Sequence, residues 1–307
     1  MRIAFRIDSG PGIGMGHLTR MSALADAFSE YGVESVFFST SNEPIDYKGF
    51  DAIIADSYLL SDEYINDLNN KAPLIICYDD NALYTYSCDI LVNANLHAKT
   101  LEFRFGEKKP ELLLGGEFAL LRREFWDAEP ITVEENVKRI LVTFGGTDLN
   151  SQTKSVIDIL AGFQMCEIIA VFGPKANGYE QCKQKYSNTN NVRLYQGTEF
   201  MSGIMKQCDM AITAGGSTIY ELAALGIPSI IIPQADNQLL ASDYFLKNGL
   251  MKSVGWWADL DSQTLLKETE SLMFNKDRRY EESELLKKEV NQKGAFHLVK
   301  KIMGKKK

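Results

Sequence analysis

The feature that most constrains the fold is the stretch of residues 211–238, with the sequence AITAGGSTIYELAALGIPSIIIPQADNQ. Residues 211–213 end a short apolar strand, a double glycine allows a tight turn, and residues 218–225 have the apolar spacing of a helix. The apolar run 229–232 reads as a second strand. A strand, loop, helix and strand in this order form one unit of a parallel sheet, so we expect an α/β fold.

The loop of this unit has the composition of an anion-binding site. Gly215 and Gly216 leave backbone N–H groups uncovered, and Ser217 and Thr218 open a helix whose positive end faces the loop. We expect a pyrophosphate there, with Glu221 one helical turn further along, within reach of a ribose. The alternative is that Thr218 and Glu221 form a capping box, which satisfies helix N–H groups and needs no ligand.

Length and charge limit the class of protein. A chain of 307 residues favours two domains of roughly 150 residues each. The net charge of −8 argues against nucleic acid as a partner. No apolar run reaches the roughly 18 residues that span a membrane, and the N-terminus lacks the apolar core of a signal peptide. We therefore expect a cytoplasmic protein with no membrane partner.

Cysteine usage and acidic clusters do not indicate a metal or a disulfide. The five cysteines are an odd number without a close pair, which is typical of reduced thiols. Asp79 and Asp80 are neighbours on an extended chain, so their carboxylates point in opposite directions. The triplet 259–261, Asp-Leu-Asp, stands where a helix starts and is interpreted as a cap. We expect no metal and no cofactor.

The first half opens with a strand over 3–7, followed by the glycine-rich loop DSGPGIGMG. Apolar residues at helical spacing from Leu18 onward place His17 at or just before the first turn of a helix. The dipole of that helix disfavours a charged imidazole and favours a general base. The alternative is a histidine without special function. The loop does not fit the G-x-G-x-x-G pattern of dinucleotide-binding proteins.

Polar residues follow the next strands, expected at 33–39, 51–55, 74–78 and 90–93. Because ligands gather at the carboxyl ends of parallel strands, these residues should converge on one crevice with His17. The converging residues are Asp56, Tyr58, Asp79, Asp80 and Asn95. We expect His97, in a polar loop after the last of these strands, to be a solvated or structural residue and not a catalytic one.

A second series of strands begins after a polar linker at 127–138. A strand at 140–144 ends in Gly145, Gly146 and Thr147, and further strands are expected at 168–172 and 192–195. Amphipathic helices follow from residue 277. We expect two Rossmann-like domains, residues 1–130 and residues 131–307, the second including the C-terminal helices.

Several motifs together resemble one family. They are RIDSGPGIGMGHLTR, ADSY, YDDNA, CDILVNANLHAK, GGEFALLRREF, FGGTD and AGGSTIYELAALGIPSI with DNQ at 236–238. In these motifs the chain is similar to the UDP-sugar hydrolases of pseudaminic acid biosynthesis. The resemblance covers nearly the whole chain and implies the glycosyltransferase B fold, in which two Rossmann-like domains face each other across a cleft.

The resemblance also implies roles for individual residues. His17 is expected to be the catalytic base, and UDP is expected on the second domain. Because a base on one side of C1 can activate water while UDP leaves from the other, inverting hydrolysis without a metal is expected. Residues expected near the sugar are Asp8, Gly14, Gly16, Tyr58, Asn95, Asn237 and Gln238. Residues expected to hold UDP are Gly145, Gly146, Thr147, Gly215, Gly216, Ser217, Thr218 and Glu221.

Three classes of function remain open at this point. The first is a UDP-sugar hydrolase, in which water is the acceptor. The second is a glycosyltransferase that passes the sugar from the same donor to a hydroxyl group. The third is a nucleotide-sugar-binding protein without turnover. We expect a monomer that binds a UDP-sugar. Release of UDP in the absence of an acceptor distinguishes the three classes of function.

Overall fold

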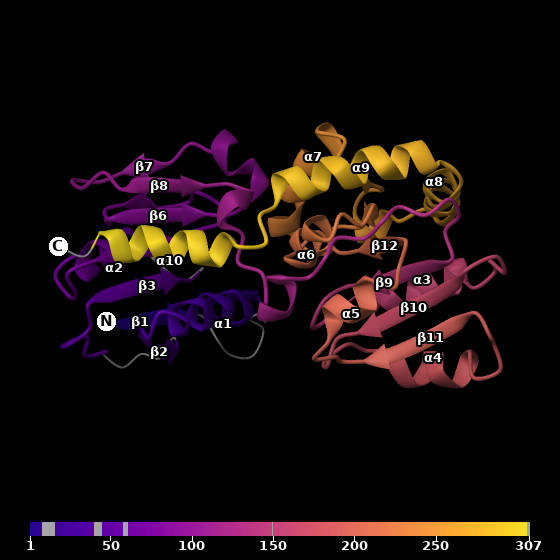
Figure 1. Ribbon diagram of the computed structural model, residues 1–307, viewed down its shortest axis with the longest axis horizontal. Helices are drawn as coiled ribbons and strands as arrows, with labels where there is room; N and C mark the ends of the chain where they lie inside the picture. The colour runs from indigo at the N-terminus through magenta and orange to yellow at the C-terminus, as the bar shows by residue number, and fades with distance from the viewer. Residues whose placement is uncertain (8–15, 40–44, 58–60, 149, 306–307) are drawn as a thin grey trace. The chain divides into compact units, whose positions relative to one another are not determined.

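The computed structural model describes residues 1–7, 16–39, 45–57, 61–148 and 150–305. The chain forms two compact units, Met1–Trp126 with Asn291–Lys307, and Asp127–Val290 (Figure 1). In the described residues each unit contains a six-stranded parallel sheet with helices packed on it. The α/β fold with parallel sheets is therefore as the sequence predicts.

The first unit has the strand order β2-β1-β3-β4-β6-β8. A separate pair, β5 with β7, is also parallel. The strands are β1 Arg2–Ile7, β2 Glu34–Ser39, β3 Ala52–Asp56, β4 Ile75–Tyr78, β5 Thr85–Tyr86, β6 Ile90–Asn93, β7 Arg104–Phe105 and β8 Glu111–Leu114. The helices are α1 Gly16–Ser29, α2 Asp62–Leu68 and α10 Gly294–Gly304, with short 3-10 turns η1 Leu96–Thr100, η2 Gly116–Phe118 and η3 Arg123–Phe125.

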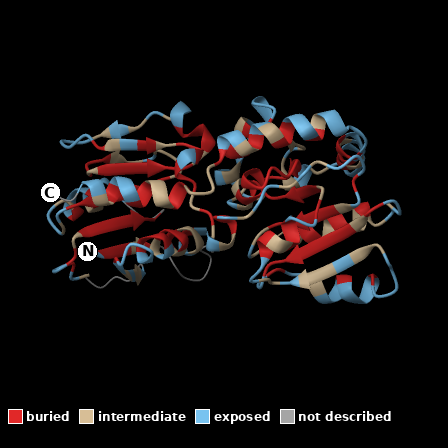
Figure 2. Ribbon diagram, viewed as in Figure 1, coloured by how far each residue is buried: buried red, intermediate tan, exposed pale blue. Residues whose placement is uncertain are grey.

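The apolar strands β1, β3, β4 and β6 of this unit are covered on both faces (Figure 2). Alternate residues of a strand point to opposite faces, so Ile53 and Ile54 enter different cores. Ile54 packs with residues of α1 and α10, whereas Ile53 packs with Ile65 and Leu68 of α2. A strand covered in this way reads as an unbroken apolar run, as the sequence predicts for 3–7.

The second unit has the strand order β11-β10-β9-β12-β13-β14. Its strands are β9 Arg139–Thr143, β10 Glu167–Phe172, β11 Val192–Gln196, β12 Met210–Thr213, β13 Ser229–Ile231 and β14 Lys252–Ser253. Its helices are α3 Gln152–Leu160, α4 Tyr179–Lys185, α5 Met201–Met205, α6 Thr218–Ala224, α7 Leu239–Lys247, α8 Ser262–Phe274 and α9 Lys276–Glu289, with η4 Asp236–Gln238 and η5 Trp257–Asp259. Asp261 caps α8 by accepting the N–H of Thr264, which confirms its interpretation as a cap.

The last helix, α10, belongs to the first unit, so its expected place in the C-terminal domain is wrong. Leu298, Val299 and Ile302 of α10 are buried in the core that also contains Met21 and Leu24 of α1. An amphipathic sequence shows which face of a helix is apolar but does not show which sheet covers that face. The chain therefore passes from the first unit to the second and returns to the first.

The predicted linker, 127–138, is fastened to the second unit. Ile131 donates its N–H to the carbonyl of Leu225 at 2.9 Å. The buried guanidinium of Arg279 donates to the carbonyls of Glu134 and Glu135, each at 2.9 Å, and also to two carbonyls at the end of α8.

The described residues include no helix long and apolar enough to cross a membrane.

Candidate active site

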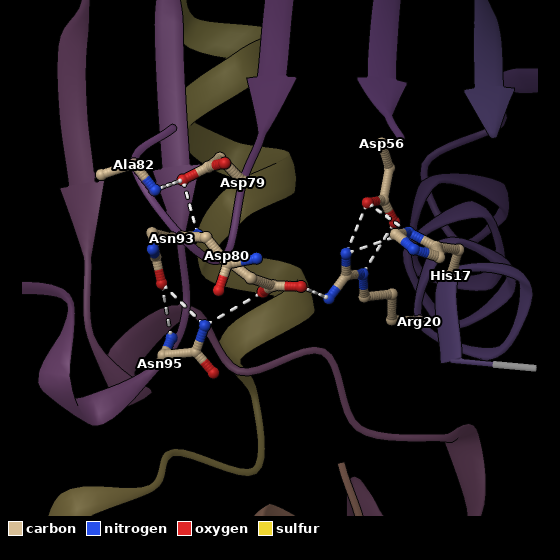
Figure 3. A network of polar contacts seen from close by, with 9 residues as sticks. His17, Arg20, Asp56, Asp79, Asp80, Ala82, Asn93 and Asn95 are labelled. Atoms are coloured by element: carbon tan, nitrogen blue, oxygen red, sulfur yellow. Dashed lines mark hydrogen bonds and ion pairs between the residues drawn. The ribbon is translucent and has the colours of Figure 1, made fainter. Parts of the chain in front are cut away.

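His17 is the second residue of α1 and is almost fully buried, with 4% of its surface exposed. Its Nδ1 lies 2.7 Å from Oδ1 of Asp56, the last residue of β3. Asp56 is completely buried and pairs in register with Ile7, at the carboxyl end of β1. The structure therefore brings His17 to the strand end that the sequence predicts, with Asp56 as its direct partner (Figure 3).

The contact with Asp56 determines which ring nitrogen of His17 carries the proton. An ionised carboxylate only accepts hydrogen bonds, so Nδ1 must be the protonated nitrogen of a neutral ring. Nε2 is then the ring atom with a lone pair, which is the atom that a general base uses. A histidine oriented by a buried carboxylate is suited to take a proton from water or from a hydroxyl group.

Arg20, one turn after His17 on α1, joins two carboxylates in this site. Its Nε donates to Oδ2 of Asp56 and its Nη1 to Oδ2 of Asp80, each at 2.7 Å. Its guanidinium lies over the ring of Tyr78, 4.4 Å from the ring centre. Burial opposes the charge of Arg20, but Asp56 and Asp80 outweigh burial and raise its pKa well above the usual value.

Arg20 is a site residue that the sequence prediction missed. A spacing of three residues on a helix places it on the same face as His17. The two strand-end aspartates were already expected nearby, so an arginine at this spacing was an available signal.

Asp79 and Asp80, which follow β4, make contacts with different partners. Oδ2 of Asp79 accepts the N–H groups of Asn81 at 3.0 Å and Ala82 at 2.6 Å, and Ala82 has a φ of 54°. Asp79 therefore holds a tight turn, whereas Asp80 faces Arg20 and accepts from Asn95. The carboxylates thus point to different partners, as their adjacency predicts. In the described residues, no group of three or more His, Cys, Asp or Glu side chains is placed to hold a metal.

Asn95, an expected sugar contact, follows β6 and lies in the same network. Its Nδ2 donates to Oδ1 of Asp80 and to Oδ1 of Asn93, each at 3.0 Å. His97, two residues later, is 5% exposed, so it is a buried residue and not a solvated one. Burial lowers the pKa of His97, although Asp80 acts in the opposite direction. The polar strand ends of the first unit therefore converge, as expected.

Three residues expected near the sugar, Asp8, Gly14 and Tyr58, lie outside the described residues. Gly16, another of that set, is the first residue of α1, and the position of its absent Cβ faces open space. Its role in binding the sugar stays a prediction.

In the second unit, the two glycine loops follow neighbouring strands. Thr143 of β9 pairs in register with Thr213 of β12, so Gly145, Gly146 and Thr147 leave the sheet beside the loop that starts at residue 214. Gly145 has a φ of 79°, in the region that favours glycine. These loops lie at the carboxyl ends of parallel strands, where open α/β sheets bind ligands.

The loop before α6 is held by Gln238. Oε1 of Gln238 accepts the N–H groups of Gly215 at 3.1 Å and Gln234 at 2.8 Å. A Cβ at position 215 would lie only 2.4 Å from Oγ of Ser242, so a larger residue here would require Ser242 to move. Gln238, predicted to contact the sugar, thus supports the predicted nucleotide loop with its amide oxygen. Asn237 is exposed in η4.

The helix of the opening motif starts one residue too early for the capping box. α6 begins at Thr218, its N-cap residue is Ser217, and the Ser217 side chain makes no capping hydrogen bond. Thr218 is therefore the first residue of α6 and not its N-cap residue. Glu221 is buried in α6, and its contact with a ribose stays a prediction.

Comparison with known proteins decides the family. Residues 139–298, more than half of the chain, match the glycosyltransferase family 28 C-terminal domain. The chain belongs to this family. The matched region contains both glycine loops described above and begins at the first residue of β9.

Curated relatives of this family 28 member include proteins named as hydrolases. The pseudaminic acid cytidylyltransferase and UDP-2,4-diacetamido-2,4,6-trideoxy-beta-L-altropyranose hydrolase of Helicobacter pylori is 28% identical over 277 residues, 87% of this chain and 50% of that protein. The UDP-2,4-diacetamido-2,4,6-trideoxy-beta-L-altropyranose hydrolase of Campylobacter jejuni is 26% identical over 273 residues, 81% of this chain and 97% of that protein. An uncharacterised protein of Methanocaldococcus jannaschii is 27% identical over 80% of this chain and 58% of its own length.

The chain thus spans about half the length of the Helicobacter and Methanocaldococcus proteins and nearly all of the Campylobacter protein. These similarities confirm the family resemblance found in the sequence. Among solved structures, MurG of Acinetobacter baumannii matches with a TM-score of 0.69 at 14% identity, over 99% of this chain and 100% of that chain. The expected glycosyltransferase B fold is confirmed.

Proposed function

We propose that this protein hydrolyses a UDP-linked 2,4-diacetamido-2,4,6-trideoxyhexose to UDP and the free sugar, in the biosynthesis of a pseudaminic-type nonulosonic acid. The observation that carries the proposal is the buried contact of 2.7 Å between His17 Nδ1 and Asp56 Oδ1, which is the arrangement of an oriented general base. The Helicobacter and Campylobacter relatives, named as hydrolases of such a UDP-sugar, supply the substrate class.

In the proposed reaction, Nε2 of His17 takes a proton from water while the water oxygen attacks C1 of the sugar. The C1–O bond to UDP breaks with inversion, and the bonding electron pair leaves with the β-phosphate oxygen. Backbone N–H groups of the loops 145–147 and 216–218 offset the charge of UDP, so a metal is not needed for departure. The proton on His17 then passes to solvent.

A glycosyltransferase is the second candidate. The match to a glycosyltransferase family 28 domain and the fold shared with MurG favour it directly. His17 would then deprotonate an acceptor hydroxyl group in place of water, and the product would be a glycoside. A protein that binds nucleotide sugars without turnover is the third class, and it predicts UDP-sugar binding with no products.

Incubation of the purified protein with UDP-diacetamido-trideoxyhexoses, without any acceptor, tests the proposal. Hydrolysis predicts release of one UDP for each free sugar, with the sugar in the inverted anomeric form when it is first observed by NMR. In heavy-oxygen water the label should enter the C1 hydroxyl group and not the UDP. Binding without UDP release, or release that depends on an added acceptor, would overturn hydrolysis in favour of one of the other two classes.

A further inference from the structure

Arg20 is the centre of a continuous chain of charged contacts in the first unit (Figure 3). On one side it donates hydrogen bonds to both oxygens of Asp56, from Nε to Oδ2 at 2.7 Å and from Nη2 to Oδ1. On the other side Nη1 holds Asp80, which accepts from Asn95. The order of contacts is therefore His17, Asp56, Arg20, Asp80 and Asn95.

Arg20 also touches His17 directly. Its Nη2 lies 3.1 Å from His17 Nδ1, and both nitrogens share Oδ1 of Asp56 as an acceptor. A neutral ring with its proton on Nδ1 fits this arrangement, since both nitrogens are then donors to one oxygen. A second proton on the ring would place two cations side by side, which costs free energy in a buried site.

Arg20 compensates the negative charges of the two carboxylates near His17, Asp56 and Asp80. Asp56 is completely buried, so little water can screen it if its cation is removed. Without Arg20, two carboxylates would stand in this network, and the imidazole that touches Asp56 would be the nearest group able to gain a positive charge. A histidine that holds a proton on both nitrogens cannot act as a base.

We propose that Arg20 is a positioning residue, which opposes the protonation of His17 and joins this base to the Asp80–Asn95 side of the site. The second half of the proposal rests on the proposed function, because Asn95 is a predicted sugar contact. The first half concerns only the ring of His17 and holds for any reaction. A purely structural ion pair would instead leave the titration of His17 unchanged.

The groups that contact His17, or act on it through Arg20 and Asp80, come from β3, α1, the end of β4 and η1. Asp56 comes from β3, Arg20 from α1 itself, and Tyr78 and Asp80 reach Arg20 from the end of β4. His97, on η1, is coupled electrostatically to Asp80. Any change of charge at Arg20 or Asp80 therefore acts on His17 through these contacts.

Imidazole ¹⁵N NMR of the full chain tests this directly, because the sequence contains only three histidines. The spectra report both the tautomer and the midpoint of protonation, and His17→Asn assigns the signal of His17. In the unsubstituted protein we expect the neutral ring with the proton on Nδ1. Arg20→Met should move the midpoint of His17 upward by about one pH unit or more, since it removes a cation in contact with the ring.

Asp80→Asn should move the midpoint of His17 in the opposite direction, because Arg20 would then face one carboxylate only. Arg20→Lys keeps the charge and should give a smaller upward shift than Arg20→Met. Arg2→Met removes a half-exposed arginine that pairs with Glu34 on the same unit, and should leave His17 unchanged. His297, on α10, is an internal reference in every spectrum.

The double variant Arg20→Met with Asp56→Asn tests whether Arg20 acts through Asp56. In the Asp56→Asn background, the upward shift caused by Arg20→Met should shrink to a minor part of its size. An unchanged midpoint in Arg20→Met, or shifts of the same sign in Arg20→Met and Asp80→Asn, would overturn the proposal. If Arg20→Met does not fold, the directions in which Arg20→Lys and Asp80→Asn shift the protonation midpoint of His17 still test the proposal.

Kinetics separate this proposal from the proposed function. If the protein is a hydrolase, the acid limb of kcat/KM in Arg20→Met should move by the same number of pH units as the NMR midpoint. A limb that stays in place while kcat falls equally at every pH would point to a purely structural role. If no UDP is released at all, the proposed hydrolysis fails. The direction of the His17 midpoint shifts in NMR still tests whether Arg20 opposes protonation of His17.

Discussion

At the scale of the residue, His17 is expected to act in the transition state and not in ground-state binding. His17→Asn keeps a side-chain N–H that can donate to Asp56 but removes the basic nitrogen. We expect kcat to fall by about 10²–10⁴ with little change in the affinity for UDP. Steady-state assays of UDP release and calorimetric titration with UDP measure the two quantities.

The matched control for that substitution is His297→Asn, a histidine on α10 whose nearest acidic partner is Glu117 at 3.7 Å. This control should keep the full rate. A His17→Asn variant with unchanged kcat would remove His17 from the chemistry and leave it as a buried partner of Asp56.

Glu221 in α6 is expected to act in binding. If its carboxylate holds the ribose of UDP, Glu221→Ala should raise KM for the UDP-sugar about tenfold or more, equal to roughly 1.4 kcal/mol or above. Calorimetric titration with UDP should show the same loss, because the contact is with the nucleotide. An unchanged KM in a folded variant would assign Glu221 to the packing of α6 alone.

At the scale of the element, α9 carries an acid that favours its neutral form. Burial raises the pKa of Glu282 from 4.5 to about 7, although Arg278 donates to its Oε1 at 2.8 Å and opposes the shift. The folded state therefore binds this proton more tightly than the unfolded state. The resulting stability, roughly 3 kcal/mol at most, is present below about pH 4.5 and is lost as the pH rises through about 7.

Glu282→Gln should remove this pH dependence, since a glutamine stays neutral. We expect the variant to exceed the unsubstituted protein in free energy of unfolding at pH 8 by about 1–3 kcal/mol, with little difference at pH 4.5. Urea unfolding at both pH values measures this. Glu284→Gln on the same helix is the control, because Lys287 lowers the pKa of the half-exposed Glu284. Equal stability of both variants at pH 8 would contradict a buried neutral Glu282.

At the scale of the whole molecule, the two last helices stabilise different units. Leu298 of α10 is buried in the core of the first unit, and Leu286 of α9 is buried in the second. Each Leu→Ala substitution should cost about 2–5 kcal/mol in the unit that contains it. Hydrogen exchange should therefore show lost protection in β1 and β3 for Leu298→Ala, and in β9 and β12 for Leu286→Ala.

Leu285→Ala, next to Leu286 but 40% exposed, is the control and should change protection little. If UDP binds to the second unit, as proposed, saturating UDP should increase protection there, because a ligand stabilises the part of a protein that binds it. Equal loss of protection in both units for Leu298→Ala would show that they unfold as one.

Much of the architecture follows from local sequence patterns. Unbroken apolar runs locate the strands because a strand covered on both faces has no polar positions, and the order strand, glycine loop, helix makes the sheets parallel. Strand ends then locate Asp56, Asp80 and Asn95 near His17, because parallel strands end at one edge.

Other properties depend on partners that are distant in the sequence. Arg20 enters the site because Asp56 and Asp80, 36 and 60 residues away, come within hydrogen-bond distance of it. Gln238 supports Gly215 across 23 residues. Similarly, α10 joins the first unit because its apolar face is covered by α1 and the first sheet. A sequence pattern reports local periodicity and residue chemistry, whereas the choice among distant partners depends on how the whole chain packs.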